Sequence, residues 1–295
     1  MRILLLGANG QVGHELRRSL MPLGDVVATT RSGTLPDGGV CEVADFDQPD
    51  SLTALVDRIA PVAVVNAAAY TAVDKAEDDE AAAFRINAEA PGVLARACAS
   101  RGIPFVHYST DYVFDGRGTR PYREDDAVDP LGVYGASKRA GEDAVRAAGG
   151  MHLILRTAWV YGLHGHNFLR TMLRVGAERD ELRVVADQIG TPTPASLIAD
   201  VTTALLRTPD AASGTFHLTS RGETSWHGFA DAIFDEAIAL GLVARAPRVV
   251  AITTADYPTR ARRPAYSRLD IGKLEQQLGY ALPDWRDGLR KVLAG

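Results

Sequence analysis

Residues 2–13 read RILLLGANGQVG, and this stretch decides the fold. The apolar run at 2–6 is typical of a buried parallel strand, and a helical pattern follows at 11–20. Glycines between the two allow a tight turn, a close approach of a pyrophosphate to the backbone, and close packing of the helix on the strand. Such loops also occur as plain turns, but a position between strand and helix favours dinucleotide binding. The predicted cofactor-binding residues of this loop are Gly7, Asn9, Gly10, Gln11, Val12 and Gly13.

Strand and helix patterns alternate through the first half of the chain. Further strands are expected at 26–30, 62–69, 105–110 and 153–161, and helices near 51–60, 80–101 and 134–148. This alternation predicts an α/β fold with a Rossmann-type, doubly wound parallel sheet and right-handed crossovers. Ligands of such sheets bind beyond the carboxyl ends of the strands. The residues at those ends are Gly7, Ala67 to Tyr70, Thr110 and Trp159.

A tyrosine and a lysine stand four residues apart in YGASK at 134–138. On a helix they share one face, so Tyr134 and Lys138 can address the same point. A nearby ammonium lowers the pKa of a phenol from about 10, which suits Tyr134 to act as a general acid toward a carbonyl oxygen. Thr110 ends an apolar strand and can give that oxygen a second hydrogen bond. A bare YxxxK pattern is usually a solvated helix face; the glycine loop upstream favours catalysis here.

The composition is that of an ordinary globular protein. The chain has 295 residues, 46% of them hydrophobic and 23% charged, enough for one large domain or two intimate ones. No apolar run approaches the ~20 residues of a membrane span, and the N-terminal segment lacks a signal-peptide pattern. Cys41 and Cys98 form neither a disulfide framework nor a zinc site, so we expect a reduced, cytoplasmic protein. A net charge of -5 disfavours nucleic acid as a partner.

Several stretches are specific when taken together. They read GQVG at 10–13, NAAAYTAVDKAE at 66–77, HYSTDYVF at 107–114, YGASK at 134–138, RTAWVY at 156–161, DQ at 187–188, PT at 192–193 and RP at 263–264 with Ser267. The joint pattern resembles the extended short-chain dehydrogenase/reductase superfamily and, within it, the dTDP-4-dehydrorhamnose reductases. The resemblance runs over nearly the whole chain.

That resemblance implies an enzyme that reduces the C4 ketone of dTDP-4-dehydro-β-L-rhamnose in the last step of dTDP-L-rhamnose synthesis. Tyr134 would donate the proton, Lys138 would support it and hold the nicotinamide ribose, and Thr110 would hold the ketone oxygen. The further cofactor contacts that the family implies are Asp45, Phe46, Ala67, Ala68, Ala69, Tyr70, Thr71 and Tyr108. The residues that resemble its substrate site are Thr71, Thr110, Asp111, Tyr112, Trp159 and Arg263; Trp159 can equally be a core residue.

The end of the second predicted strand bears on the cofactor. NAD-preferring folds usually place an acid there for the ribose 2′-hydroxyl, whereas an arginine suits the 2′-phosphate of NADP. This chain has Thr30 and Arg31 at that point and no acid. We therefore predict NADPH and leave the use of NADH open; the alternative is that Arg31 is a solvated loop residue.

Beyond residue 150 the elements become shorter, with patterns at 168–179, 194–206, 216–219 and 225–240. We expect residues 1–150 to form an NADP(H)-binding Rossmann domain and residues 151–295 mainly a smaller, mixed α/β substrate-binding lobe. The segments at roughly 170–200 and 235–260 are expected to pack back on the first domain. No linker rich in glycine, serine or proline marks the boundary.

Basic and histidine residues suggest two further sites. Arg260, Arg262 and Arg263 suit a nucleotide diphosphate, although a solvated basic loop is a close alternative. The spacing of His107, His164 and His166 matches no standard metal-ligand set, so we predict core and loop histidines.

Some members of the family hold Mg²⁺ at a dimer interface through two glutamates. Glu15 matches the first, but Ser196 stands where the second is expected. A hard cation would lack that ligand, so we predict no metal, and both a monomer and a homodimer remain open.

Three alternative functions share the fold. A sugar-nucleotide 4,6-dehydratase or epimerase would retain NAD, and dehydratases carry an Asp-Glu pair after the threonine, where this chain has Asp111 and Tyr112. A 4-ketoreductase for another nucleotide-activated deoxysugar remains open. A non-catalytic regulatory subunit, as found with methionine adenosyltransferase, is disfavoured by the intact Thr110, Tyr134 and Lys138.

Overall fold

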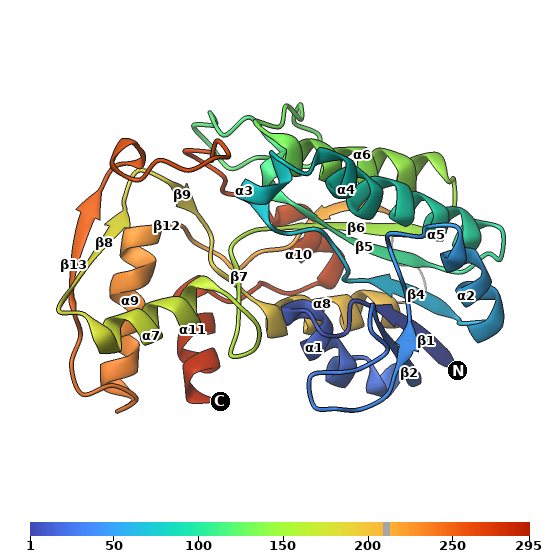
Figure 1. Ribbon diagram of the computed structural model, residues 1–295, viewed down its shortest axis with the longest axis horizontal. Coiled ribbons are helices and arrows are strands. Elements are labelled where there is room, and N and C mark those ends of the chain that lie inside the picture. The colour runs from blue at the N-terminus through green and yellow to red at the C-terminus, as the bar shows by residue number, and fades with distance from the viewer. Residues whose placement is uncertain (209–212) are drawn as a thin grey trace.

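A seven-stranded parallel sheet forms the centre of the computed structural model, which describes residues 1–208 and 213–295 (Figure 1). The strand order reverses on the two sides of β1, and the site of that reversal is where doubly wound sheets bind ligands. The predicted fold class is confirmed. In spatial order the strands are β3 (Glu42–Val43), β2 (Asp25–Thr30), β1 (Arg2–Leu6), β4 (Ala63–Asn66), β5 (Phe105–Thr110), β6 (His152–Thr157) and β11 (Gly214–His217).

Helices cover both faces of the sheet, which explains why the central strands β1 and β4 are almost entirely apolar. Ile3 and Leu5 face one layer of helices, and Leu4 and Leu6 face the other. The first layer contains α1 (Gln11–Ser19), η1 (Met21–Leu23), α8 (Ala195–Arg207) and α10 (Gly272–Leu278). The second contains α2 (Ser51–Ile59), the π turn η2 (Arg85–Glu89), α5 (Ala90–Ala99) and α6 (Val133–Ala147). Against α6 pack α3 (Val73–Ala76), α4 (Glu80–Phe84) and η3 (Asp111–Val113).

A second lobe lies beside the carboxyl ends of the strands (Figure 1). Leu169, Phe229 and Leu289 are buried in its core. None of the helices in the described part of the chain has the length and apolar character needed to cross a membrane. The lobe and its junction contain β7 (Val160–Tyr161), α7 (Phe168–Glu178), β8 (Glu181–Val185), β9 (Ile189–Gly190), β10 (Thr193–Pro194), β12 (Thr224–Ser225), α9 (Trp226–Ala239), β13 (Arg248–Ile252), η4 (Thr254–Asp256) and α11 (Trp285–Ala294).

The segments that return to the sheet differ from those expected. α8 packs against α1, β11 extends the sheet beside β6, and α10 packs under β11. Of the expected ranges 170–200 and 235–260, only 195–200 lies in α8; most of the remainder belongs to the core of the second lobe. The returning segments are thus the ones whose apolar side chains meet the sheet's own core.

The predicted strand at 153–161 is two strands in the structure. β6 ends at Thr157 and β7 begins at Val160. Trp159 between them has a φ of +48°, a left-handed conformation that side chains other than glycine rarely adopt. This residue breaks the pairing and directs the chain from the sheet into the second lobe.

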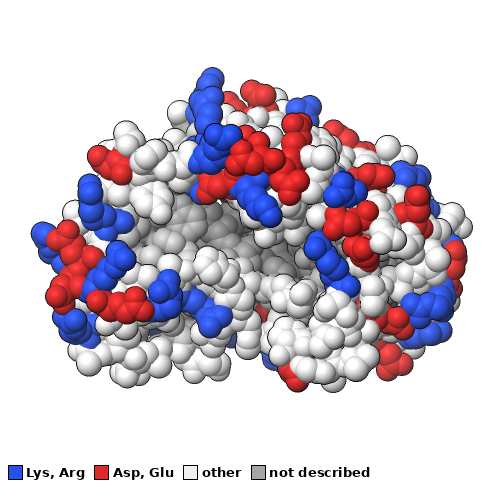
Figure 2. Space-filling model, viewed as in Figure 1, with Lys and Arg blue, Asp and Glu red and all other residues white. Residues whose placement is uncertain are grey.

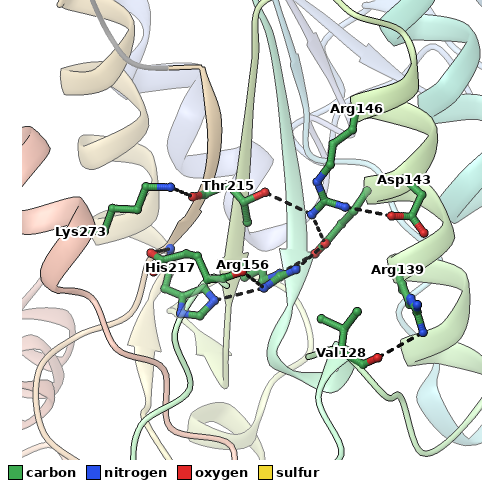
Figure 3. A network of polar contacts seen from close by, with 10 residues as sticks. Val128, Arg139, Asp143, Arg146, Arg156, Thr215, His217 and Lys273 are labelled. Carbon is green, nitrogen blue, oxygen red and sulfur yellow. Dashed lines mark hydrogen bonds and ion pairs between the residues drawn. The ribbon is translucent and has the colours of Figure 1, made fainter. Parts of the chain in front are cut away.

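A buried ion pair ties α6 to the sheet (Figure 3). Arg156 on β6 is 2% exposed and donates from Nε and Nη2 to the carboxylate of Glu142 on α6, which is 0% exposed, at 2.8 and 2.7 Å. Arg146 Nη2 donates to the same carboxylate at 2.7 Å. Burial and the Arg156 charge lower the pKa of His217 to about 3, so the imidazole beside Arg156 is neutral. The network fixes the helix that carries Tyr134 and Lys138.

Replacing Arg156 with methionine should destabilise the protein by about 3–5 kcal/mol, because it leaves the Glu142 charge buried without its main partner. Arg58→Met is the matched control, since the Arg58–Glu42 pair is also bidentate but largely exposed and should contribute only about 0–1 kcal/mol. Urea unfolding at neutral pH measures both. Equal losses in the two variants would contradict the anchoring role of the buried pair.

Candidate active site

A cavity of about 830 Å³ opens at the carboxyl ends of β1, β4 and β5. Figure 2 shows this face of the molecule hollowed, with charged side chains of both signs along its rim. Most of the residues predicted to bind the cofactor line it: Gly7, Asn9, Gly10, Gln11, Val12, Thr30, Arg31, Phe46, Ala67, Ala68, Ala69, Tyr70, Thr71, Tyr108, Tyr134 and Lys138. Residues that line it without having been predicted are Ala44, Ala72, Lys75, Ile86, Ser109, Thr157, Val160, Gly165 and His166.

The glycine loop leaves bare backbone along one wall of the cavity. Gly7 has a φ of +77°, and a Cβ there would lie 2.5 Å from the Ala68 nitrogen. A Cβ on Gly13 would lie 2.0 Å from the Gly7 carbonyl oxygen, so no larger residue allows α1 to pack so closely. No side chain caps the N-terminus of α1. Free helix amides beside a tight glycine turn fit the pyrophosphate of a dinucleotide.

Two of the predicted cofactor residues do not line the cavity. Gly13 packs against the turn instead, as its role in helix packing requires. Asp45 accepts hydrogen bonds from the Asp47 amide at 3.0 Å and from Gln48 Nε2 at 3.4 Å, so its carboxylate shapes the turn that carries Phe46. Arg31 lines the cavity with its side chain 68% exposed, and its Nη2 lies 3.5 Å from Asp47 Oδ2. Its guanidinium is therefore accessible to a ligand.

Tyr134 and Lys138 both reach the cavity from α6. The sequence predicts a pKa of Tyr134 lowered by Lys138, but burial raises it, and the Thr110 hydroxyl is the group that acts to lower it. Lys138 Nζ instead donates to the Tyr108 carbonyl oxygen at 2.6 Å. Burial lowers the pKa of Lys138 to about 8, against the opposing effect of Glu142. Tyr134 is thus a protonated phenol near neutrality, as a proton donor must be.

Thr110 is already engaged by its neighbours. Its Oγ1 donates to Asp111 Oδ1 at 2.9 Å and accepts from the Tyr112 amide at 3.2 Å. Because a hydroxyl has one proton, Thr110 can donate to a ligand only by turning away from Asp111. Burial raises the pKa of Asp111 to about 6. Neither Thr110 nor Asp111 lines the cavity in this structure, although Tyr134 lies close to both.

The predicted substrate residues fall into two groups. Thr71 lines the cavity, whereas Tyr112 packs edge-on against Tyr134 at 5.6 Å and also contacts Arg263. Arg263 Nη2 pairs with Asp74 Oδ2 at 2.6 Å, so this guanidinium is already neutralised. Trp159 is partly buried, stacks on Trp226 at 3.6 Å against the core of the second lobe, and does not line the cavity. The contact of Trp159 with the substrate stays a prediction.

Two supporting residues escaped prediction. Asn87, buried in the π turn, accepts from the Tyr70 amide at 2.8 Å and donates to the Tyr70 carbonyl at 3.0 Å and to Ser137 at 3.0 Å. It thereby fixes one wall of the cavity to α6. Glu77 accepts the first free amide of α6, from Val133, at 2.9 Å. Asn87 could be found from the sequence, because it is an amide side chain inside an apolar helical pattern. No local sequence feature points to Glu77.

The residues beside Glu15 do not fit the family's Mg²⁺ site, because Ser196 in the first turn of α8 offers no carboxylate. Ligand atoms of His14, Glu15 and His164 lie within 4.8 Å of one another. The ring centroids of His14 and His164 are 3.6 Å apart, with an angle of 34° between the ring planes. His166 lines the cavity, and His107 is buried in the sheet.

Comparison with known proteins extends over the full chain. Residues 1–295 match the model of the RmlD substrate binding domain family. A dTDP-4-dehydrorhamnose reductase of Burkholderia thailandensis is 50% identical, with 97% of this chain and 96% of that protein aligned, and one of Escherichia coli is 45% identical, with 99% and 97% aligned. The crystal structure of dTDP-4-dehydrorhamnose reductase from Bacillus anthracis in complex with NADP has a TM-score of 0.90 at 34% identity, covering 99% of this chain and 98% of that one. The similarity includes both the sheet and the second lobe.

Asp111→Asn should stabilise the protein at pH 8 by about 2–3 kcal/mol. The reason is that burial raises the pKa of Asp111 from 3.8 to about 6, so ionisation costs stability above pH 6 and asparagine does not ionise. Below pH 3.8 the carboxyl is protonated in both the folded and the unfolded chain, so the gain should shrink as the pH falls from 6 toward 4. Urea unfolding at several pH values measures this gain in stability. A variant less stable than the parent at pH 8 would show that ionisation of Asp111 does not destabilise the fold.

Proposed function

Because this chain belongs to the RmlD substrate binding domain family, we propose that it reduces the C4 ketone of dTDP-4-dehydro-β-L-rhamnose to dTDP-β-L-rhamnose. This reaction is the last step of dTDP-L-rhamnose biosynthesis. The protein is an NAD(P)H-dependent oxidoreductase with a Rossmann-type sheet. The observation that supports the proposal most directly is that the partly buried phenol of Tyr134 and the buried amine of Lys138 share one cavity with a bare glycine loop.

Reduction of a ketone needs a hydride at carbon and a proton at oxygen. NADPH supplies the hydride when it is bound. Tyr134 gives its phenolic proton to the oxygen of C4, because its raised pKa keeps that proton in place until negative charge develops. Lys138 follows Tyr134 by four residues on α6, so the two side chains share a helix face and the Lys138 ammonium can stabilise the resulting phenolate. Thr110 orients the oxygen after its hydroxyl turns from Asp111.

The cofactor is held by the two walls of the cavity. The glycine loop and the N-terminus of α1 hold the pyrophosphate, and the small side chains of Ala67 to Ala69 let the ribose lie close. Arg31 binds the 2′-phosphate of NADPH, since its guanidinium is accessible and no acid lies at the end of β2. Lys138 uses its remaining N–H groups for the nicotinamide ribose.

Cofactor binding and substrate binding belong to the two parts of the chain that have separate hydrophobic cores. Residues 1–150 form the NADP(H)-binding unit, and α8, β11 and α10 complete it. The second lobe with its Leu169 and Phe229 core forms the wall for the sugar nucleotide. Thr71 lines the cavity. Tyr112 and Arg263 contact each other outside that lining, and Arg263 meets the diphosphate of the substrate by exchanging Asp74 for it.

Tyr134→Phe should lower kcat at least 10²-fold, because the ring remains but the proton donor is lost. NADPH binding should be unchanged, whereas Lys138→Ala should weaken both binding and turnover. The assay follows NADPH consumption optically with dTDP-4-dehydrorhamnose as substrate. Tyr280→Phe is the control, since Tyr280 is 51% exposed and lies away from the cavity. A Tyr134→Phe enzyme that kept most of its activity would rule out this proton donor.

Arg31→Ala should raise KM for NADPH about tenfold and leave KM for NADH nearly unchanged, because the loss of one charge-assisted hydrogen bond costs roughly 1.5 kcal/mol. Parallel assays with the two cofactors test this, with Arg18→Ala as a control at a largely exposed arginine outside the cavity. Equal changes for NADPH and NADH would show that Arg31 does not bind the 2′-phosphate.

A further inference from the structure

His107 is a buried titratable residue that the proposed mechanism does not use. It lies on β5 with no exposed surface, between the last residue of β4 and the catalytic helix α6. Its Nδ1 is 3.2 Å from Asn66 Nδ2, and its Nε2 is 3.5 Å from Lys138 Nζ. Burial and the Lys138 charge hold the pKa of His107 well below its usual range, so the imidazole is neutral. A neutral imidazole carries one proton, and its position decides what Lys138 meets.

Asn66 determines which nitrogen of His107 is protonated. The Oδ1 atom of Asn66 accepts the Ala68 amide at 3.1 Å, which fixes the orientation of the carboxamide. The NH₂ group of Asn66 therefore points at His107 Nδ1, and that nitrogen must accept. The single proton of the imidazole is then on Nε2, the atom that faces Lys138 Nζ.

An N–H that faces Lys138 favours its neutral amine over its ammonium. The amine can accept from His107 Nε2, whereas the ammonium would direct its own N–H groups at another donor. Glu142, also on α6, favours the ammonium, but Arg156 and Arg146 already neutralise that carboxylate. The other titratable neighbour on this face is Tyr134, which is uncharged. Lys138 Nζ is held in place by the Tyr108 carbonyl at 2.6 Å.

We propose that His107 is a positioning residue for the reduction: Asn66 holds it in the Nε2–H form, and in that form it sets the protonation of Lys138, whose amine the Tyr108 carbonyl holds in place. The inference rests on the proposed function for its catalytic meaning. It gives Lys138 two accessible protonation states near neutrality, so that the group can exchange a proton during turnover.

The same network reaches the cofactor wall. The Ala68 amide that Asn66 holds lies against Gly7, at the point where a Cβ on Gly7 would be only 2.5 Å away. Lys138, His107, Asn66 and Ala68 thus form one chain of contacts from the catalytic helix to the glycine loop. A change in the protonation of His107 would disturb both ends of that chain.

Nuclear magnetic resonance of the ligand-free protein tests the inference without any substrate. The chain has seven histidines and four lysines, Lys75, Lys138, Lys273 and Lys291, so signals of labelled side chains can be assigned by single substitutions. ¹⁵N shifts should show His107 protonated at Nε2 and not at Nδ1. ¹³Cε shifts should show Lys138 titrating near pH 8 in the parent protein. A His107 protonated at Nδ1 would overturn the proposal.

Two substitutions change the network in the same direction. His107→Leu removes the N–H, and Asn66→Asp offers an acceptor to Nδ1–H and moves the proton away from Nε2. Each should raise the titration midpoint of Lys138 by about one pH unit, and the fall of kcat on the alkaline side should move with it. A Lys138 midpoint that stays in place in both variants would overturn the proposal.

Val106→Ala is the control for lost packing on the same strand, because Val106 is equally buried but belongs to the opposite core. It should lower stability and leave the Lys138 midpoint unchanged; a shift as large as that of His107→Leu would show that the effect is structural. The outcome is separable from that of the proposed function. Failure of the parent enzyme to consume NADPH with the sugar nucleotide would contradict the function, whereas the resonance data decide the role of His107.

Discussion

The site depends on one close approach, that of the Gly7 backbone to the Ala68 backbone where β1 and β4 end side by side. No Cβ fits between them, so the two strand ends meet as bare peptide and leave a shallow wall beside the first helix amides. The strand order reverses at this point, which leaves a crevice at the carboxyl ends of β1 and β4, and the second lobe closes this crevice from the other side. Cofactor residues from distant parts of the chain converge because the sheet geometry brings their strand ends to one line.

Burial of charge gives the catalytic helix both its anchor and its chemistry. Glu142 and Arg156 are desolvated together, which fixes α6 against β6. Four residues before Glu142, the same low-dielectric environment acts on Lys138, which has no carboxylate in contact and therefore loses affinity for its proton. One helix thus carries two buried ionisable groups. Glu142 is stabilised as a charge by a direct ion-pair partner, whereas Lys138 has no such partner.

The sequence predicted the sheet and the cavity well because both follow from local patterns. Residues 105–110 form β5 as expected, and Tyr134 and Lys138 share a helix face because their spacing demands it. What failed depends on tertiary context. Trp159 adopts a left-handed conformation that no local preference indicates. The pKa of Tyr134 is raised because burial outweighs the Thr110 hydrogen bond, while Lys138 bonds to the Tyr108 carbonyl. The returning segments were misplaced because amphipathic helices alone do not specify which core they cover.

The acidic segment at 74–78 connects parts that the chain itself keeps far apart. Asp74 holds Arg263, Asp78 holds Arg260, and Glu77 caps the amide of Val133. This short segment therefore connects the N-terminus of α6 with the loop that carries Arg260 and Arg263. Substitutions in this segment would loosen both α6 and the arginine loop. They would weaken substrate binding as the loss of a sugar contact does, although the carboxylates of the segment need not contact the sugar.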